Sequence, residues 1–366
     1  MNLTSADILK ALGTVHDPDL KKDLVTLQMV RDVVVSTGEV SFTVVLTTPA
    51  CPLKEMIRQD CEKAVSPLLP EGTRLKINMT SSVTSARDNT PLLPKVKNII
   101  AIASGKGGVG KSTVTSNLAV ALAKSGAKVG LIDADIFGPS VPVMFNCENE
   151  QPEVKVVNGK NIIVPLEQYG VKLMSIGFLA PADSAVVWRG PMASAALKQF
   201  ISDADWGELD YLLIDMPPGT SDIHLTLVQT VPVTGAVIVT TPQKVALADA
   251  TKGLTMFKQP QINVPVLGII ENMAYFTPEE LPNNRYYLFG KDGGKNLAEK
   301  YGVPLLGQIP LVQGIRESGD SGLPAVLKGG ATADAFTHLA ESLARQVAIR
   351  NATFAQTKKV ELTVGV

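Results

Sequence analysis

The sequence has little cysteine and little histidine, with three residues of each among 366. The cysteines, Cys51, Cys61 and Cys147, lie far apart and include no CxxC pair. An odd, sparse set of cysteines argues against a disulfide framework and is typical of a reducing compartment. The histidines are equally scattered, so their spacing indicates no zinc site.

Long apolar runs and an excess of charge of one sign are lacking too. No apolar run approaches the ~20 residues that a membrane-spanning helix needs. The first residues lack the basic start and the apolar block of a signal peptide. The formal net charge of −1 gives no global indication of nucleic acid or an anionic membrane as a partner. We therefore expect a cytoplasmic protein that binds neither nucleic acid nor membranes.

The residues that are present predict folded domains. Apolar residues make up 45% of the chain and charged residues 19%, which allows a sizeable core. Residues 1–88 contain a helix, two strands, a second helix and a third strand, predicted at 5–12, 27–35, 40–46, 53–65 and 74–79. This order predicts a small α+β domain. Residues 89–97 carry two prolines and lie in the stretch Arg87–Lys97 of mixed charge, which predicts a linker.

The pattern changes after the linker. Apolar runs of strand length alternate with helical segments as far as a final helix at 331–350, and the runs are Ile99–Ala103, Val129–Asp133, Tyr211–Asp215, Ala236–Thr240, Val266–Glu271 and Leu305–Ile309. Runs that are apolar throughout are typical of strands buried on both faces of a parallel sheet. Residues 98–350 are therefore predicted to form a doubly wound α/β domain. Residues 351–366 are a tail without predicted structure.

A glycine-rich loop follows the first of these strands. Residues Gly105–Ser112 match the P-loop pattern GxxxxGK[ST], and a helical segment comes directly after them. Glycines let backbone N–H groups converge on phosphate oxygens, and the helix that follows directs its positive end at the anion. Lys111 can bridge the β- and γ-phosphates, and the Ser112 hydroxyl can ligate Mg²⁺. The sequence thus predicts a P-loop NTPase that binds Mg·ATP through Gly105, Lys106, Gly107, Gly108, Val109, Gly110, Lys111, Ser112 and Thr113.

Aspartates end two of the predicted strands. Asp215 ends a strand in the manner of a Walker B aspartate, which holds Mg²⁺ through water. Asp133 ends another strand and Asp135 follows two residues later. Such aspartates often only cap turns, but three of them after two strands of a P-loop domain favour a role at the phosphate site.

Lys106, directly after the first glycine, gives the loop a resemblance to the deviant Walker A class of ATPases. In that class the early lysine reaches the nucleotide of a facing subunit, which implies an ATP-sandwich homodimer. The resemblance implies that Asp135 orients the attacking water beside the catalytic Lys106 and Lys111, with Asp133 supporting Mg²⁺. It also implies that Asn272 contacts the adenine edge, although a turn-forming asparagine is an equal alternative.

Longer motifs narrow the resemblance to one family. They are IASGKGGVGKST (102–113), LIDADIFGPSVP (131–142), WRGPM (188–192), DYLLIDMPPGTSD (210–222), ENMAYF (271–276) and GQIPL (307–311). On these residues the domain resembles the Mrp/ApbC (Nbp-like) iron–sulfur cluster carriers. Residues 1–88, with DPDL (17–20) and TTPACP (47–52), resemble the iron–sulfur-assembly-associated domain that precedes such ATPases.

The sequence departs from this family in one loop. The family usually carries a CxxC there, whose thiolates hold a bridging [4Fe–4S] cluster in the dimer, but residues 277–289 contain no cysteine. The candidate ligand that remains is Cys51, which precedes a predicted helix whose dipole favours a thiolate. A small buried residue at a strand–helix corner is an equal alternative for Cys51.

The resemblance therefore implies an ATP-hydrolysing homodimer that carries iron–sulfur clusters to apo-proteins and works with an assembly scaffold. The missing CxxC keeps open a nucleotide-gated chaperone that never holds a cluster. A MinD/ParA-like positioning ATPase would predict a basic C-terminal amphipathic helix, whereas the tail carries only Lys358 and Lys359.

Overall fold

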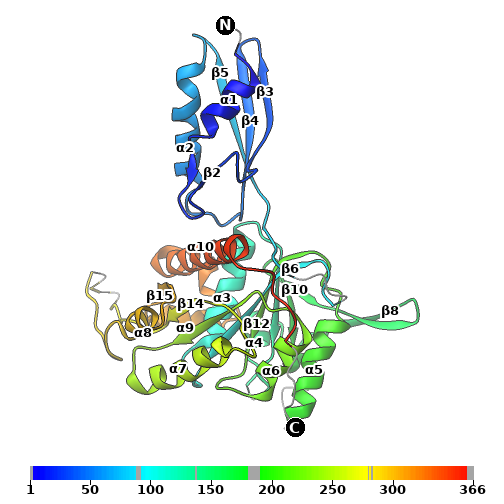
Figure 1. Cartoon of the computed structure of the whole chain (residues 1–366). Coiled ribbons are helices and arrows are strands. Elements are labelled where there is room, and N and C mark those ends of the chain that lie inside the picture. Colours follow the sequence, from blue (N-terminus) through cyan, green and yellow to red (C-terminus); the bar gives the residue numbers. More distant parts are fainter. Residues whose placement is uncertain are drawn as a thin grey trace. The chain divides into compact units, whose positions relative to one another are not determined.

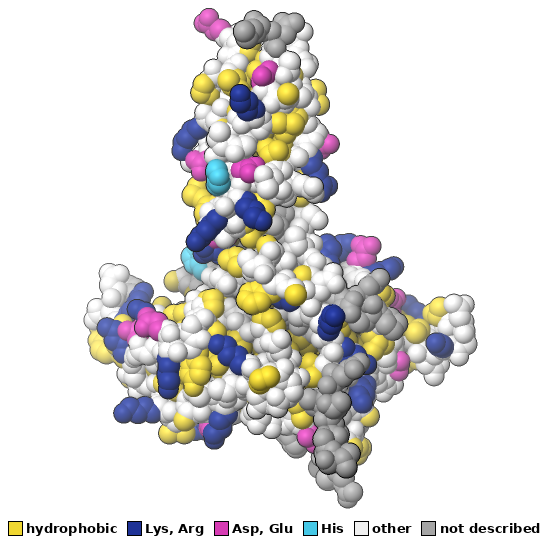
Figure 2. Space-filling model, in the orientation of Figure 1, with side chains coloured by type: hydrophobic (Ala, Val, Ile, Leu, Met, Phe, Trp, Pro, Cys, Tyr) yellow, Lys and Arg dark blue, Asp and Glu magenta, His cyan; other side chains and the backbone are white. Residues whose placement is uncertain are grey.

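The computed structural model describes residues 3–87, 92–136, 138–179, 190–278, 280–281 and 283–360. The chain forms two compact units. The first comprises Met1–Thr84 with Ala348–Phe354, and the second comprises Ser85–Val347 with Ala355–Val366. On the face that Figure 2 shows, Lys and Arg side chains lie among Asp, Glu and apolar ones. None of the described helices combines the length and the apolar character that crossing a membrane requires.

The first unit is a three-stranded sheet packed against two helices. Its elements are α1 (Ser5–Leu12), β1 (His16–Asp17), β2 (Lys22–Asp23), β3 (Val30–Ser36), β4 (Glu39–Leu46), α2 (Lys54–Val65), the 3₁₀ turn η1 (Ser66–Leu68) and β5 (Arg74–Ser81). The sheet order is β3-β4-β5, with β3 antiparallel and β5 parallel to β4. Alternate residues of β4, from Val40 to Leu46, are buried against the helices. The predicted α+β unit is confirmed.

Local sequence explains where these elements begin. The Thr4 hydroxyl accepts the N–H of Asp7 at 3.3 Å and the Asp7 carboxylate accepts the N–H of Thr4 at 3.0 Å, so reciprocal bonds start α1. The strand predicted from residue 27 begins only at Val30. Its first residues form a turn instead, in which Gln28 has a φ of 56° and Met29 N–H donates to the Leu24 carbonyl.

The second unit is built on an eight-stranded sheet. Its order is β10 (Leu166–Gln168), β11 (Val171–Ser175), β7 (Val129–Asp133), β12 (Leu209–Asp215), β6 (Val96–Ser104), β13 (Gly235–Thr240), β14 (Val266–Glu271) and β15 (Leu305–Gln308). All neighbours are parallel except β10, which is antiparallel to β11. The doubly wound sheet is confirmed. Because β6 lies between β12 and β13, the chain reverses direction across the sheet there, where such folds bind ligands.

Helices cover the sheet of this unit (Figure 1). They are α3 (Lys111–Lys124), α4 (Val141–Met144), α5 (Gly190–Ser202), α6 (Asp222–Thr230), α7 (Lys244–Lys258), α8 (Gly293–Tyr301), α9 (Gln313–Asp320) and α10 (Gly330–Thr353), with the 3₁₀ turns η2 (Ile176–Leu179) and η3 (Ala325–Leu327). Residues Ile99–Ala103 of β6 are buried, which fits their unbroken apolar sequence.

Some elements differ from the predicted pattern. The sequence indicated neither β10 and β11 nor the hairpin of β8 (Glu153–Val157) and β9 (Lys160–Val164), because these strands are short or exposed. β6 begins at Val96, inside the predicted linker, and α10 runs to Thr353, inside the predicted tail. Later in that tail, Thr357 N–H donates to the Ala86 carbonyl.

Candidate active site

The glycine-rich loop joins β6 to α3 at the carboxyl end of the sheet. Gly110 is the N-cap of α3 with a φ of 77°, a conformation that favours glycine. Gly105 is required for another reason. A Cβ there would lie 2.1 Å from the Asp249 carbonyl oxygen, because α7 packs directly on the loop. One glycine of the motif therefore serves helix packing as well as phosphate approach.

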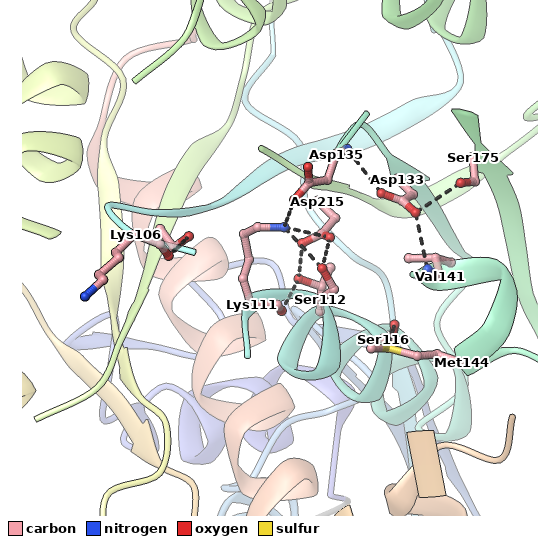
Figure 3. Close-up of polar contacts among 12 residues, drawn as sticks. Lys106, Lys111, Ser112, Ser116, Asp133, Asp135, Val141, Met144, Ser175 and Asp215 are labelled. Carbon is pink, nitrogen blue, oxygen red and sulfur yellow. Dashed lines mark hydrogen bonds and ion pairs between the residues drawn. The ribbon is translucent and has the colours of Figure 1, made fainter. Parts of the chain in front are cut away.

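Lys111 is the centre of a buried polar network (Figure 3). Its ammonium lies 2.8 Å from the Asp215 carboxylate, 3.2 Å from the Ser112 hydroxyl and 3.7 Å from the Asp135 carboxylate. The Ser112 hydroxyl donates to Asp215 at 2.5 Å, and the Thr115 hydroxyl donates to its other oxygen at 2.9 Å. The sequence predicted four of these five residues for the site and missed Thr115, which follows the motif by one helical turn.

Asp133 is fully buried and faces another set of groups. Its carboxylate accepts the N–H groups of Asp135 and Val141, each at 3.2 Å, and the Ser175 hydroxyl at 3.0 Å. Burial raises the pKa of Asp133 to about 7, and the nearby Asp215 carboxylate acts in the same direction. These bonds tie the end of β7 to the first residue of α4. They give Asp133 a definite role in holding the segment that carries Asp135, while its predicted support of Mg²⁺ stays a prediction.

Lys106 behaves differently from Lys111. Its side chain is exposed and points away from the network in Figure 3. Among the described residues no ion pair forms with its ammonium, whereas its backbone carbonyl accepts the Ser104 hydroxyl at 3.1 Å. A lysine directed outward from a phosphate loop is available to a group outside its own chain.

Two adjoining cavities border the loop. One, of about 220 Å³, is lined by residues 106–113 together with Ser104, Asp135, Ser140, Met144 and Pro218. The other, of about 610 Å³, shares Gly110, Thr113, Ser140 and Met144 with it and extends to residues 310–312 and the exposed face of α9. A cavity lined by Lys111, Ser112 and Asp135 at a helix N-terminus, joined to a larger, mainly apolar one, has the character needed for a triphosphate and a nucleobase.

Asn272 lines the larger cavity and is buried. Its side-chain amide donates to the Val109 carbonyl at 2.8 Å, so it also fixes the phosphate loop. This bond uses the NH₂ group and leaves the Asn272 carbonyl oxygen as the acceptor for a base. The predicted contact with adenine remains a prediction, and the bond to Val109 gives this asparagine a role that sequence reasoning did not assign.

The donor set fits magnesium. Ser112 and Asp215 offer adjacent hard oxygen ligands, which Mg²⁺ prefers, and Mg²⁺ at such sites is completed by phosphates and water. Within the described ranges, no group of three or more His, Cys, Asp or Glu residues could hold a metal ion. A magnesium ion held by these two residues would depend on the nucleotide and water for its remaining ligands.

The cysteines differ in their surroundings, and none is in a disulfide. Burial raises the pKa of Cys61 and of Cys147 to about 12, which keeps both thiols protonated at neutral pH. Cys51 is partly exposed and lies two residues before Leu53, the N-cap of α2. Because Leu53 offers no side-chain acceptor, the first N–H groups of α2 favour a nearby anion.

The loop of residues 277–289 is described except for positions 279 and 282. Phe276 and Tyr286 exchange two backbone hydrogen bonds of 2.8 Å, which close the loop at its base. The Arg285 guanidinium lies 4.3 Å from the centre of the Tyr275 ring. Among its described residues, the large apolar side chains that it exposes are Leu281, Tyr286, Tyr287 and Leu288.

The sequence did not indicate three further residues that line the larger cavity. The far wall of the larger cavity comes from Val312, Ile315 and Arg316 around α9. Only their nearness to the GQIPL motif could have indicated them.

Comparisons with known proteins agree with this geometry. Residues 95–347 match the family described as ParA, NUBPL iron-transfer P-loop NTPase, and residues 5–78 match the family described as iron-sulfur cluster assembly protein. An iron-sulfur cluster carrier protein of Synechocystis sp. is 49% identical over 351 residues, which cover 95% of this chain and 99% of that protein. One of Escherichia coli strain K12 is 42% identical over 344 residues, 94% of this chain and 91% of that protein.

A solved structure also resembles this chain. The nucleotide-binding protein of Archaeoglobus fulgidus, solved in complex with ADP, has a TM-score of 0.55 and 42% identity. The match covers 64% of this chain and 89% of that one.

Proposed function

Because the chain belongs to the family of NUBPL iron-transfer P-loop NTPases, we propose that it hydrolyses ATP in order to carry iron–sulfur clusters to apo-proteins. The observation that carries the proposal is the network of Lys111, Ser112 and Asp215 beside a phosphate-sized cavity. It occurs in a chain whose residues 5–78 match an iron–sulfur assembly family. Client apo-proteins and an assembly scaffold would be its partners in the cytoplasm, without nucleic acid or membrane.

The residues around the smaller cavity divide the work of ATP hydrolysis. Backbone N–H groups of the loop and the Lys111 ammonium bind the phosphates, and Asn272 accepts from the base. Ser112 and Asp215 would hold Mg²⁺, which would neutralise part of the negative charge of the phosphates. Asp135 lines the same cavity and lies 3.7 Å from Lys111, which suits it to orient the attacking water.

We infer that two copies close over ATP. Support comes from the exposed Lys106 ammonium, which points away from its own network and has no ion pair among the described residues. A second copy facing it would offer a triphosphate as its partner. Hydrolysis would then reopen the pair through the segments 135–142 and 216–222, and so couple ATP turnover to release of the cargo.

Lys106→Ala is expected to reduce ATP-dependent dimerisation by about tenfold or more, a cost of about 1.4 kcal/mol. ATP affinity of a single chain should change by less than about threefold, because the Lys106 ammonium points away from the network of Lys111. Sedimentation with a non-hydrolysable ATP analogue measures the first quantity, and titration under monomeric conditions measures the second. Lys128→Ala, which removes another exposed lysine, is the matched control. An unchanged dimer population would contradict the sandwich.

The cargo requires soft ligands, and Cys51 is the thiol best suited to provide one. Iron–sulfur clusters are held by thiolates, and burial keeps Cys61 and Cys147 as protonated thiols. Cys51 lies near the start of α2, where no side chain caps the helix and the helix dipole stabilises a thiolate. Two copies of the chain would supply two such ligands. The remaining positions would be filled by small thiols or by a client's cysteines, so the cluster should be labile.

Cys51→Ser is expected to lose most of the iron and sulfide that the protein binds after anaerobic reconstitution. The wild type should bind substoichiometric iron that chelators remove within the experiment. Cys147→Ser and Cys61→Ser are the controls and should bind as the wild type does. Iron and sulfide counts with absorbance spectra measure the outcome. Equal binding by wild type and Cys51→Ser would exclude this ligand.

A chaperone that handles apo-proteins without holding a cluster is the second candidate. The observation that favours it is the loop 277–289, which has aromatic side chains and no cysteine. If the wild type binds no iron after reconstitution and still hydrolyses ATP, this second function is the correct one.

A further inference from the structure

His224 is a buried titratable residue that the proposed reaction does not use. It lies in the first turn of α6, directly after the segment Met216–Ser221, and is 1% exposed. Its ring lies 6.2 Å from the ring of Phe257 on α7, measured between centroids. Its Nε2 atom is buried and has no hydrogen-bond partner among the described residues.

The contacts of His224 favour one tautomer of its ring, and the Ser221 hydroxyl, 3.3 Å from Nδ1, can donate to it. The backbone N–H of Ser221 points to Nδ1 at 3.2 Å. Nδ1 can accept this bond only when it carries no proton, so the neutral ring carries its proton on Nε2. Burial lowers the pKa of His224 to about 4, which agrees with a neutral ring.

This bond completes an unusual capping box. Ser221 is the N-cap of α6 and His224 occupies the third helical position, where Glu or Gln ordinarily returns the hydrogen bond to the N-cap. A neutral histidine accepts the N–H of the N-cap residue through Nδ1 and, unlike Glu, carries no negative charge. The residue thus fixes the backbone of Ser221 without adding a buried anion.

The segment before Ser221 lies against the phosphate loop. Gly219 N–H donates to the Ser104 carbonyl at 2.8 Å, and Pro218 lines the smaller cavity. Gly219 has a φ of 81°, a backbone conformation that favours glycine. Hydrogen bonds at both ends of the turn hold it in this conformation. Ser104 fixes the turn at Gly219, and His224 fixes it two residues later at Ser221.

We propose that His224 is a positioning residue for ATP hydrolysis, which holds the turn Pro217–Ser221 in place beside the phosphates through its bond to Ser221. The proposal rests on the ATPase function proposed above. His224 lines neither of the two cavities at the phosphate loop. It acts through Ser221 on the backbone of Pro218 and Gly219, the part of the turn that borders the phosphate cavity.

Two substitutions separate this role from simple packing. His224→Leu removes the acceptor and should lower kcat by about tenfold or more, with the KM for ATP within about threefold, because phosphate binding by Lys111 is untouched. His224→Gln restores an acceptor at a position where Gln is a standard capping residue, so it should recover most of kcat. His338→Gln, at an exposed histidine, is the control. A kcat of His224→Leu within twofold of wild type, or a His224→Gln variant as slow as His224→Leu, would overturn the proposal.

Nitrogen-15 NMR of the wild type tests the same claim without a substitution. The chain has three histidines, so His16→Gln and His338→Gln identify the other two signals. At pH 7, His224 should show an unprotonated Nδ1 and a protonated Nε2. A proton on Nδ1, or a doubly protonated ring, would overturn the proposal. Because this spectrum needs no ATP, it tests the bond between His224 and Ser221 even if the wild type were to hydrolyse no ATP and so refute the ATPase function proposed above.

Discussion

Lys111→Ala is expected to weaken ATP binding by at least about 100-fold, or about 2.7 kcal/mol. Lys111 is the cation that the helix α3 presents at the smaller cavity, and its side chain is 5% exposed. A charge-assisted bond to phosphate in such a site is roughly twice as strong as a neutral one. Isothermal titration with Mg·ATP measures the loss. An affinity within about threefold of wild type would refute the assignment of the phosphate site.

The substitution also affects the fold, and this effect must be measured separately. Removal of Lys111 leaves the fully buried Asp215 carboxylate without its cation, although the hydroxyls of Ser112 and Thr115 still donate to it. Breaking a buried ion pair costs about 3–5 kcal/mol. Urea unfolding of the variant shows whether it is folded at the titration temperature. Lys106→Ala, at the exposed lysine of the same loop, is the matched control for single-chain binding.

Asp135→Asn is expected to retain ATP binding and to lower kcat by about 100-fold or more, the usual contribution of a positioned acid or base. Its carboxylate side chain is 14% exposed and borders the phosphate cavity. The amide keeps the size of the side chain but cannot accept a proton from water. Because the closed pair would then fail to reopen, ATP should accumulate in a long-lived dimer.

Single-turnover hydrolysis measures the chemical step, and titration measures binding. Asp205→Asn, at an exposed carboxylate of the same unit, is the control. Turnover by Asp135→Asn within about threefold of wild type would show that another group orients the water. A large loss of ATP affinity would instead assign Asp135 to binding, together with Lys111.

The sequence located the phosphate site because its parts are local. Gly105–Ser112 match a contiguous pattern, and the strand and helix on either side are set by apolar runs that can be recognised within a few residues. Asp215 was found in the same way, since it ends the buried strand β12. The family followed from longer contiguous motifs and is confirmed by the matching family over residues 95–347.

Contacts made across the fold were not predicted, even for Asn272, which the resemblance placed at the adenine edge. Thr115 reaches Asp215 from one turn further along α3, and Asn272 reaches Val109 from 163 positions away in the sequence. The strands β10 and β11 were missed because their apolar runs are short, although β11 pairs with β7. Each of these contacts depends on how separate elements meet at one end of the sheet.

By itself, the sequence determined the parallel-sheet fold, the phosphate loop and the family, because propensity, burial pattern and motif spacing are properties of neighbouring residues. Only the tertiary structure decided in which direction the side chains of those residues point and what they contact. It turned Lys111 toward Asp215 and Lys106 away from it, placed α7 where Gly105 can carry no side chain, and buried His224 against Ser221 and Phe257. The physical reason is that burial and direction arise from the packing of distant elements, which no local pattern encodes.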